Sequence, residues 1–224
     1  MNPIGRKGCA LLLALLLALS FSGCSIINSI FGAKFDAAGY VQGGLDCLYK
    51  GEFDQYMELT EATEEEAKQT YEEGLEAEAD VFEQYIGAEG VITDASRAKI
   101  IELYKSIYAK SNYSVKLLSE TNGVYVVEVV IHPIDIFTNC YDDATAYVDS
   151  FYEKDEAGEF DGLTDEEYSD KYIQGLLDLY TAYVPEIGYN EAKTLTVQVK
   201  QDDSGLYTLS DEDMQNIDTW IIEY

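Results

Sequence analysis

The dipeptide Asn122-Gly123 is a strong local signal for the fold of this chain. It separates two segments, 113–120 and 124–131, that are rich in β-branched and aromatic residues. Asn-Gly between two such segments is typical of a type I′ turn, because both turn residues must adopt positive φ. The sequence therefore predicts an antiparallel hairpin at this position, and Pro133 ends its second strand.

A second hairpin is predicted near the C-terminus. Its strands are expected over residues 191–200 and 206–209, on either side of the turn Asp202-Asp203-Ser204-Gly205. Calcium-binding loops also place acids beside a turn glycine, but this stretch is shorter than the spacing that calcium requires. We therefore interpret it as a hairpin turn.

Helices are predicted before and after each hairpin. Thr63 and Thr164 each precede a glutamate by three residues, the capping-box pattern that begins a helix. Asp94 is expected to cap another helix, and the apolar period over residues 137–151 predicts one continuous helix. The first helix, which begins near Phe35, is expected to end at Gly51.

This order of elements predicts an α+β fold, in which helices pack on an antiparallel sheet built from two β-hairpins. No linker divides residues 35–224, which we interpret as a single acidic domain. The order of helices followed by a hairpin occurs twice, and Gly51-Glu52-Phe53-Asp54 has a counterpart in Gly158-Glu159-Phe160-Asp161. An internal helix-helix-hairpin duplication with halves 35–133 and 134–224 is therefore one alternative.

Residues 1–23 have the features of a secretory signal. Arg6 and Lys7 precede an apolar run over residues 9–19, which is too short for a membrane span of roughly 20 residues. The segment Phe21-Ser22-Gly23-Cys24 resembles the lipobox of bacterial lipoproteins, although the family usually has Leu where this chain has Phe21.

The resemblance implies diacylglycerol, with acyl chains such as palmitate, on the Cys24 sulfur, followed by cleavage before Cys24. Residues 24–34 would then be a lipidated tether, and the protein would be attached to the extracytoplasmic face of the cell membrane. Two acyl chains anchor a protein stably.

The rest of the chain resembles, in composition and order of elements, the small uncharacterised lipoproteins of Gram-positive anaerobes. That likeness is carried by the lipobox, the acidic helices, the Tyr-rich hairpins and the run from Tyr113 to Ile131-His132-Pro133. Some domains of this kind are cystatin-like, with helices around a curved antiparallel sheet. The resemblance implies that fold as an alternative and no activity.

Charge restricts the partners of the domain. The chain has 43 Asp and Glu against 14 Lys and Arg, and two of the bases lie in the signal. Phosphate binding needs clustered bases, so we expect no nucleic-acid partner. An anionic membrane would repel this surface, so we expect membrane contact through the lipid on Cys24. An unknown protein or small ligand remains as partner, and a cationic one would suit the charge.

Cys47 and Cys140 remain once the signal and the lipid account for Cys9 and Cys24. In an exported chain they are compatible with one disulfide. Both also lie on or beside apolar helical stripes, where a free cysteine behaves as a small buried hydrophobe. The sequence leaves these alternatives open.

Chemical motifs are scarce. The acid runs 64–66, 165–167 and 211–213 are expected in the first turns of helices, where they favour the helix dipole. His132 has no second His or nearby Cys in sequence and is expected to be structural or exposed. We predict no catalytic residue, metal ligand or cofactor.

We therefore expect a non-catalytic binding or interaction module, while enzymatic activity stays open. The main alternative is an extracytoplasmic cell-wall hydrolase using two carboxylates. A solute-receptor subunit of a transporter is the less favoured third reading, because about 200 residues are few for a two-lobed clamp.

Overall fold

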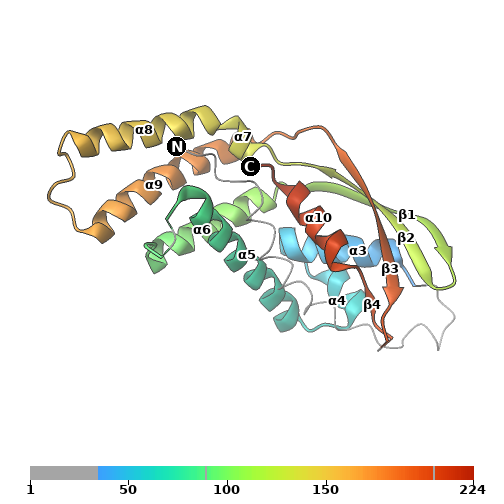
Figure 1. The fold of residues 1–224 in the computed structure, drawn as a ribbon. Helices are drawn as coiled ribbons and strands as arrows, with labels where there is room; N and C mark the ends of the chain where they lie inside the picture. The colour runs from blue at the N-terminus through green and yellow to red at the C-terminus, as the bar shows by residue number, and fades with distance from the viewer. Residues whose placement is uncertain (1–34, 89, 204) are drawn as a thin grey trace.

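The computed structural model describes residues 35–88, 90–203 and 205–224. Its α+β fold, which was the predicted class, places helices against one face of a four-stranded antiparallel sheet (Figure 1). No helix in these residues combines the length and the apolar content that crossing a bilayer requires.

The chain begins with a helix that changes its period. Helix α3 (Ala37–Leu45) runs into the π-helical segment η2 (Asp46–Lys50), which ends at Gly51 with φ 66°. Short π segments are frequent at functional positions. Helix α4 (Asp54–Thr60) then packs closely on α3. A Cβ on Gly43 would lie 3.0 Å from the backbone nitrogen of Tyr56, so the contact between these helices needs glycine.

Helix α5 (Glu64–Ile86) begins at the predicted capping box, in which Thr63 and Glu66 hydrogen-bond reciprocally. Helix α6 (Asp94–Tyr108) differs from the prediction by one residue. Thr93, not Asp94, is its N-cap, because the Thr93 hydroxyl accepts a hydrogen bond from the Ser96 amide at 3.2 Å. Asp94 instead lies in the first turn, where its charge still favours the helix dipole.

The four strands form a meander in the order β1-β2-β3-β4. They are β1 (Asn112–Thr121), β2 (Val124–His132), β3 (Lys193–Gln201) and β4 (Tyr207–Thr208). Asn122 and Gly123 have φ of 52° and 79°, as the predicted type I′ turn requires. Strand β2 pairs with β3, so the two predicted hairpins form one sheet.

The helices between β2 and β3 form a projecting hairpin. They are α7 (Ile136–Asn139), α8 (Tyr141–Glu156), α9 (Asp165–Tyr183) and the 3-10 turn η3 (Val184–Glu186). The prediction of one helix over 137–151 was wrong, because Cys140 leaves the helical region at ψ 7° and separates α7 from α8. Phe137 of α7 lies in the main core, whereas α8 turns away and packs on α9 (Figure 1).

The main core lies between the sheet and the helices. Residues at every second position of β2, from Tyr125 to Ile131, are buried, and helix α10 (Asp211–Ile221) covers them together with α3. The opposite face of β3 is exposed. Helices of both proposed halves contribute to this one core. The internal duplication and the cystatin-like alternative stay predictions.

Candidate functional site

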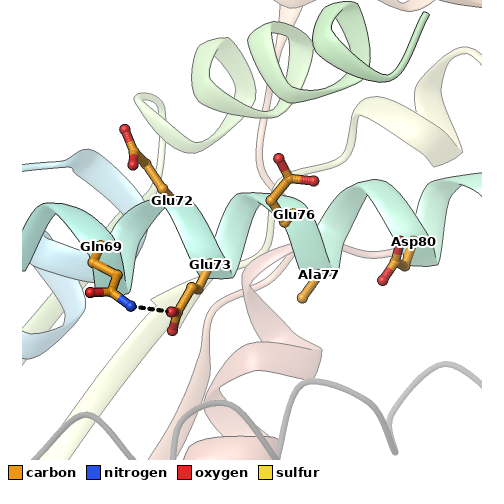
Figure 2. A pocket seen from close by; sticks show the side chains of 6 residues that line it. All are labelled: Gln69, Glu72, Glu73, Glu76, Ala77 and Asp80. Carbon is orange, nitrogen blue, oxygen red and sulfur yellow. Dashed lines mark hydrogen bonds between the residues drawn. The ribbon is translucent and has the colours of Figure 1, made fainter. Parts of the chain in front are cut away.

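One hollow of about 380 Å³ lies along α5. Its lining is acidic, and Figure 2 shows the side chains projecting from this one helix: Gln69, Glu72, Glu73, Glu76, Ala77 and Asp80. Gln69 donates a hydrogen bond of 2.7 Å to Glu73. Within the described ranges, no three His, Cys, Asp or Glu side chains are grouped as metal ligands would be. The hollow is therefore an acidic helix surface.

A second hollow, of about 370 Å³, lies between α6 and α9. Its floor contains Leu103 and Leu177, and Lys99 hydrogen-bonds to Gln174 across the two helices.

The carboxyl groups with the most altered environment lie elsewhere, inside the helical layer. Glu78 of α5 is 5% exposed, and both of its oxygens accept hydrogen bonds from tyrosines. The Tyr108 hydroxyl donates to Oε1 at 2.5 Å, and the Tyr224 hydroxyl donates to Oε2 at 3.4 Å. Burial raises the pKa of Glu78, and the negative charge of Asp218 raises it further.

Asp218 of α10 is the second member of this carboxyl pair. Its Oδ1 accepts a hydrogen bond of 3.1 Å from the Tyr49 hydroxyl. Burial raises the pKa of Asp218 as well, against the opposing effect of the Tyr49 hydrogen bond. Two like charges close together in an apolar setting resist ionising together, so the pair favours holding a proton.

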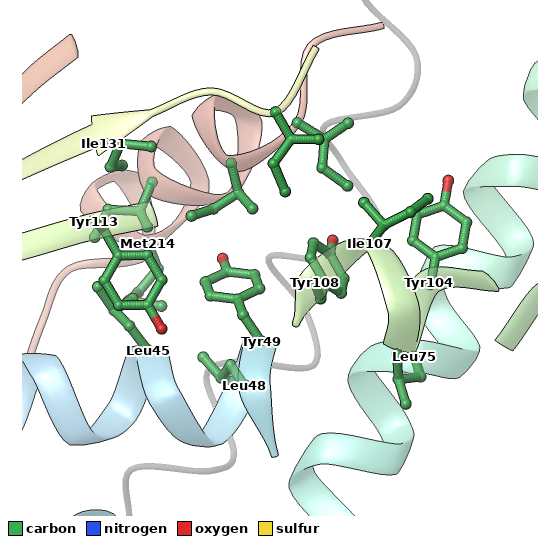
Figure 3. Packing of buried hydrophobic residues seen from close by; sticks show 14 of the residues in the cluster. Leu45, Leu48, Tyr49, Leu75, Tyr104, Ile107, Tyr108, Tyr113, Ile131 and Met214 are labelled. Atoms are coloured by element: carbon green, nitrogen blue, oxygen red, sulfur yellow. The ribbon is translucent and has the colours of Figure 1, made fainter. Parts of the chain in front are cut away.

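Four tyrosines from three parts of the chain enclose the pair. They are Tyr49 of η2, Tyr104 and Tyr108 of α6, and Tyr224 at the C-terminus. The rings of Tyr49 and Tyr108 lie 5.1 Å apart, and Figure 3 shows Tyr49, Tyr104 and Tyr108 among the core residues. The hydroxyls of Tyr104 and Tyr224 lie 2.7 Å apart. The first three tyrosines are buried, and Tyr224 exposes 38% of its surface.

This tyrosine-enclosed pair was missed in the sequence, although helical spacing contains a signal for it. Glu78 lies three residues after Leu75 and four before Phe82, on the buried stripe of α5. Asp218 lies four residues after Met214 and beside Ile217, both buried in α10. In a chain with 43 acids, two carboxyl groups on apolar stripes did not stand out.

None of the residues predicted from sequence belongs to this pair. Cys24 is outside the described residues. Cys47 and Cys140 are free and buried in separate hydrophobic clusters, so the disulfide alternative does not describe the structure. Burial raises their pKa values to about 12 and about 11, as expected of inert thiols. His132 is half-buried at the end of β2, with its ring 6.4 Å from that of Tyr189.

The fold and the site define a class: an α+β protein with a helix-covered antiparallel meander and a carboxyl pair beneath tyrosine hydroxyls. Neither a protein-family model nor a curated protein sequence matches the chain. Among solved structures, the fold of this chain is similar to the crystal structure of "a putative lipoprotein (ycdA) from Bacillus subtilis", with a TM-score of 0.61 and 20% sequence identity. The similarity covers 84% of this chain and 56% of that one, so this chain spans little more than half its length. At this identity the likeness concerns the fold alone.

Proposed function

We propose that this chain is a membrane-anchored extracytoplasmic lipoprotein whose folded part is a non-catalytic binding or interaction module. Its anchor would be the lipid on Cys24. The lipobox-like segment Phe21-Ser22-Gly23-Cys24 supports this proposal, and so does the similarity in fold to a protein described as a lipoprotein.

The observation that carries the non-catalytic part is how the carboxyl pair is enclosed. A glycoside hydrolase brings two carboxyl groups about 5 to 9.5 Å apart onto the substrate. Here both oxygens of Glu78 accept hydrogen bonds from tyrosines, and Tyr49 donates to Asp218. Neither hollow described above is lined by Glu78 or Asp218. The pair therefore supports a structural role more than an acid-base one, which disfavours the hydrolase alternative.

Two measurements test the two parts of this proposal. Metabolic labelling with a palmitate analogue should mark the wild-type chain and leave Cys24→Ser unlabelled. A thermal-shift screen of the mature chain carrying Cys24→Ser should then find one ligand class among oligosaccharides, cell-wall fragments, peptides and cations. Free ligand at a hundredfold over Kd stabilises the fold by about 2.7 kcal/mol.

A different result would favour the enzyme. If the protein released products from cell-wall fragments, and if Glu78→Gln and Asp218→Asn both abolished that release, the hydrolase alternative would replace the binding module. Unlabelled wild-type chain would contradict the lipid anchor.

A further inference from the structure

The described chain begins at one end of the sheet. The ring of Phe35 stacks on that of Tyr207 with centroids 3.5 Å apart, and it meets Tyr125 edge-on at 5.3 Å. Tyr125 is the second residue of β2, next to the Asn122-Gly123 turn. Whatever precedes Phe35 therefore joins the domain at the hairpin end of the sheet.

An exposed apolar pair lies close to that end. Leu117 and Leu118 of β1 expose 42% and 47% of their surfaces. The register shifts between Leu117 and Ser119, so a β-bulge places the two leucines in succession on an outer strand. Leu117 pairs with Val127, which is two residues along β2 from Tyr125. Two strand positions correspond to about 7 Å.

The strands of this sheet carry little of the acidity of the protein. All 43 acidic residues lie within residues 35–224. Only Glu120 and Glu128 belong to strands β1, β2 and β3, which also contain Lys116, Lys193 and Lys200. Asp202 and Asp203 add negative charge in the turn after β3. An anionic membrane would repel the helices much more than the sheet.

We propose that Leu117 and Leu118 touch the membrane surface beside the lipid anchor, which makes the hairpin end of the sheet the membrane-facing end of the domain. The inference rests on the proposed function, because it needs the lipid at Cys24. Eleven residues, 24–34, would separate Phe35 from the lipid. Eleven residues of any sequence span at most about 40 Å. The leucine pair would therefore remain within reach of the bilayer.

Bromine quenching of tryptophan tests this contact. Trp220 is the single tryptophan of the chain, so Trp220→Phe removes all native tryptophan fluorescence. Leu118→Trp then reports on the hairpin end. Tyr152→Trp is the matched control, since Tyr152 is 51% exposed but lies on α8, at the opposite end of the molecule (Figure 1).

Each mature variant is coupled through Cys24 to a maleimide phospholipid, because Cys47 and Cys140 are buried. The lipidated protein is inserted into phosphatidylcholine vesicles with brominated acyl chains. We expect the Leu118→Trp emission to fall about twofold or more relative to unbrominated vesicles, with little change for Tyr152→Trp. Equal denaturation midpoints would verify that both variants are folded.

Other outcomes overturn the inference in distinguishable ways. Equal quenching at both positions would remove the membrane contact and leave the lipoprotein proposal intact. Shielding of position 118 without quenching, together with a dimeric mass, would assign the edge of β1 to a second copy of the chain. Failure of palmitate labelling in cells would remove both proposals, because the domain would then have no anchor.

Discussion

The hydroxyl of Tyr108 donates a 2.5 Å hydrogen bond to Oε1 of Glu78, which joins α6 to α5 at a carboxyl group that is 5% exposed. A buried carboxyl group that favours its proton makes folding depend on pH in a specific direction. Below the pKa of an unfolded glutamate, both folded and unfolded chains hold the proton. Above it, only the folded chain does, so raising the pH lowers stability until the raised pKa of Glu78 is passed.

Glu78→Gln should therefore remove a pH dependence. From about pH 5 upward, the free energy of unfolding of the wild type should fall relative to that of the variant, with a slope approaching about 1.4 kcal/mol per pH unit. Urea denaturation at several pH values between 5 and 8.5 measures the difference. Glu73→Gln, an exposed change on the same helix, should show no such divergence. Parallel curves for wild type and Glu78→Gln would contradict the raised pKa of Glu78.

Tyr108→Phe should destabilise the fold, and more strongly at high pH. The variant lacks the hydroxyl that donates to Oε1 of Glu78, and losing this hydrogen bond should lower the free energy of unfolding by about 1–3 kcal/mol. Because the Tyr108 hydrogen bond lowers the pKa of Glu78, its removal raises that pKa, and the added cost should appear where Glu78 of the wild type begins to ionise, near its pKa of about 8 and above. Tyr147→Phe is the control: its hydroxyl donates to the backbone oxygens of Lys171 and Tyr172, so its cost should be constant from pH 5 to 9. A pH-independent cost for Tyr108→Phe would separate Tyr108 from the titration of Glu78.

Gly43→Ala and Gly74→Ala should have opposite effects, although both glycines lie in helices. A Cβ on Gly43 would approach the Tyr56 nitrogen to 3.0 Å, which forces α3 and α4 apart and should cost about 1–3 kcal/mol. A Cβ on Gly74 would have nothing within 4 Å, so alanine should stabilise α5 by about 0.5–1 kcal/mol. Thermal midpoints measure both, and equal shifts would rule out the close α3–α4 approach.

Arg97→Gln should weaken the contact between α5 and α6. Arg97 lies within 2.8 Å of both Glu76 and Asp80 and within 2.5 Å of Glu83. Its loss leaves three carboxylates of α5 together, and we expect a cost of about 1–2 kcal/mol at low salt. The cost should shrink in 1 M salt, because the Debye length there is only about 3 Å and exposed charges are screened from one another. Lys68→Gln removes only an exposed pair with Glu72 and should change stability by less than about 0.5 kcal/mol.

Local signals made most helix starts and the first hairpin predictable. The capping boxes at Thr63 and Thr164 and the Asn122-Gly123 turn depend on residues within four positions of each other. Thr93 and Asp94 are adjacent residues that can both cap a helix, and the sequence does not show which of them adopts the N-cap backbone conformation.

Longer-range features were not predictable in the same way. The bend at Cys140 follows from Phe137 packing in the core while α8 packs on α9, two demands made by distant parts of the chain. The pairing of β2 with β3 joins residues more than 60 positions apart. The carboxyl pair likewise forms only when the fold brings α5 and α10 together. In the sequence alone, neither Glu78 nor Asp218 differs from the other acids of the chain.

The projecting hairpin of α8 and α9 returns to the place where it left the sheet. Ile134 bridges to Tyr189, and the amide of Asn190 donates to the oxygen of Pro133 at 2.9 Å, so backbone contacts close the base of the whole excursion. Its tip, around residues 157–163, is far from β2 and β3 (Figure 1). Chain added at that tip would leave the strand register unchanged, and loop-closure entropy grows only slowly with length. The hairpin is thus a natural insertion point, where related proteins can gain or lose length and a tag or reporter domain can be grafted without disturbing the sheet.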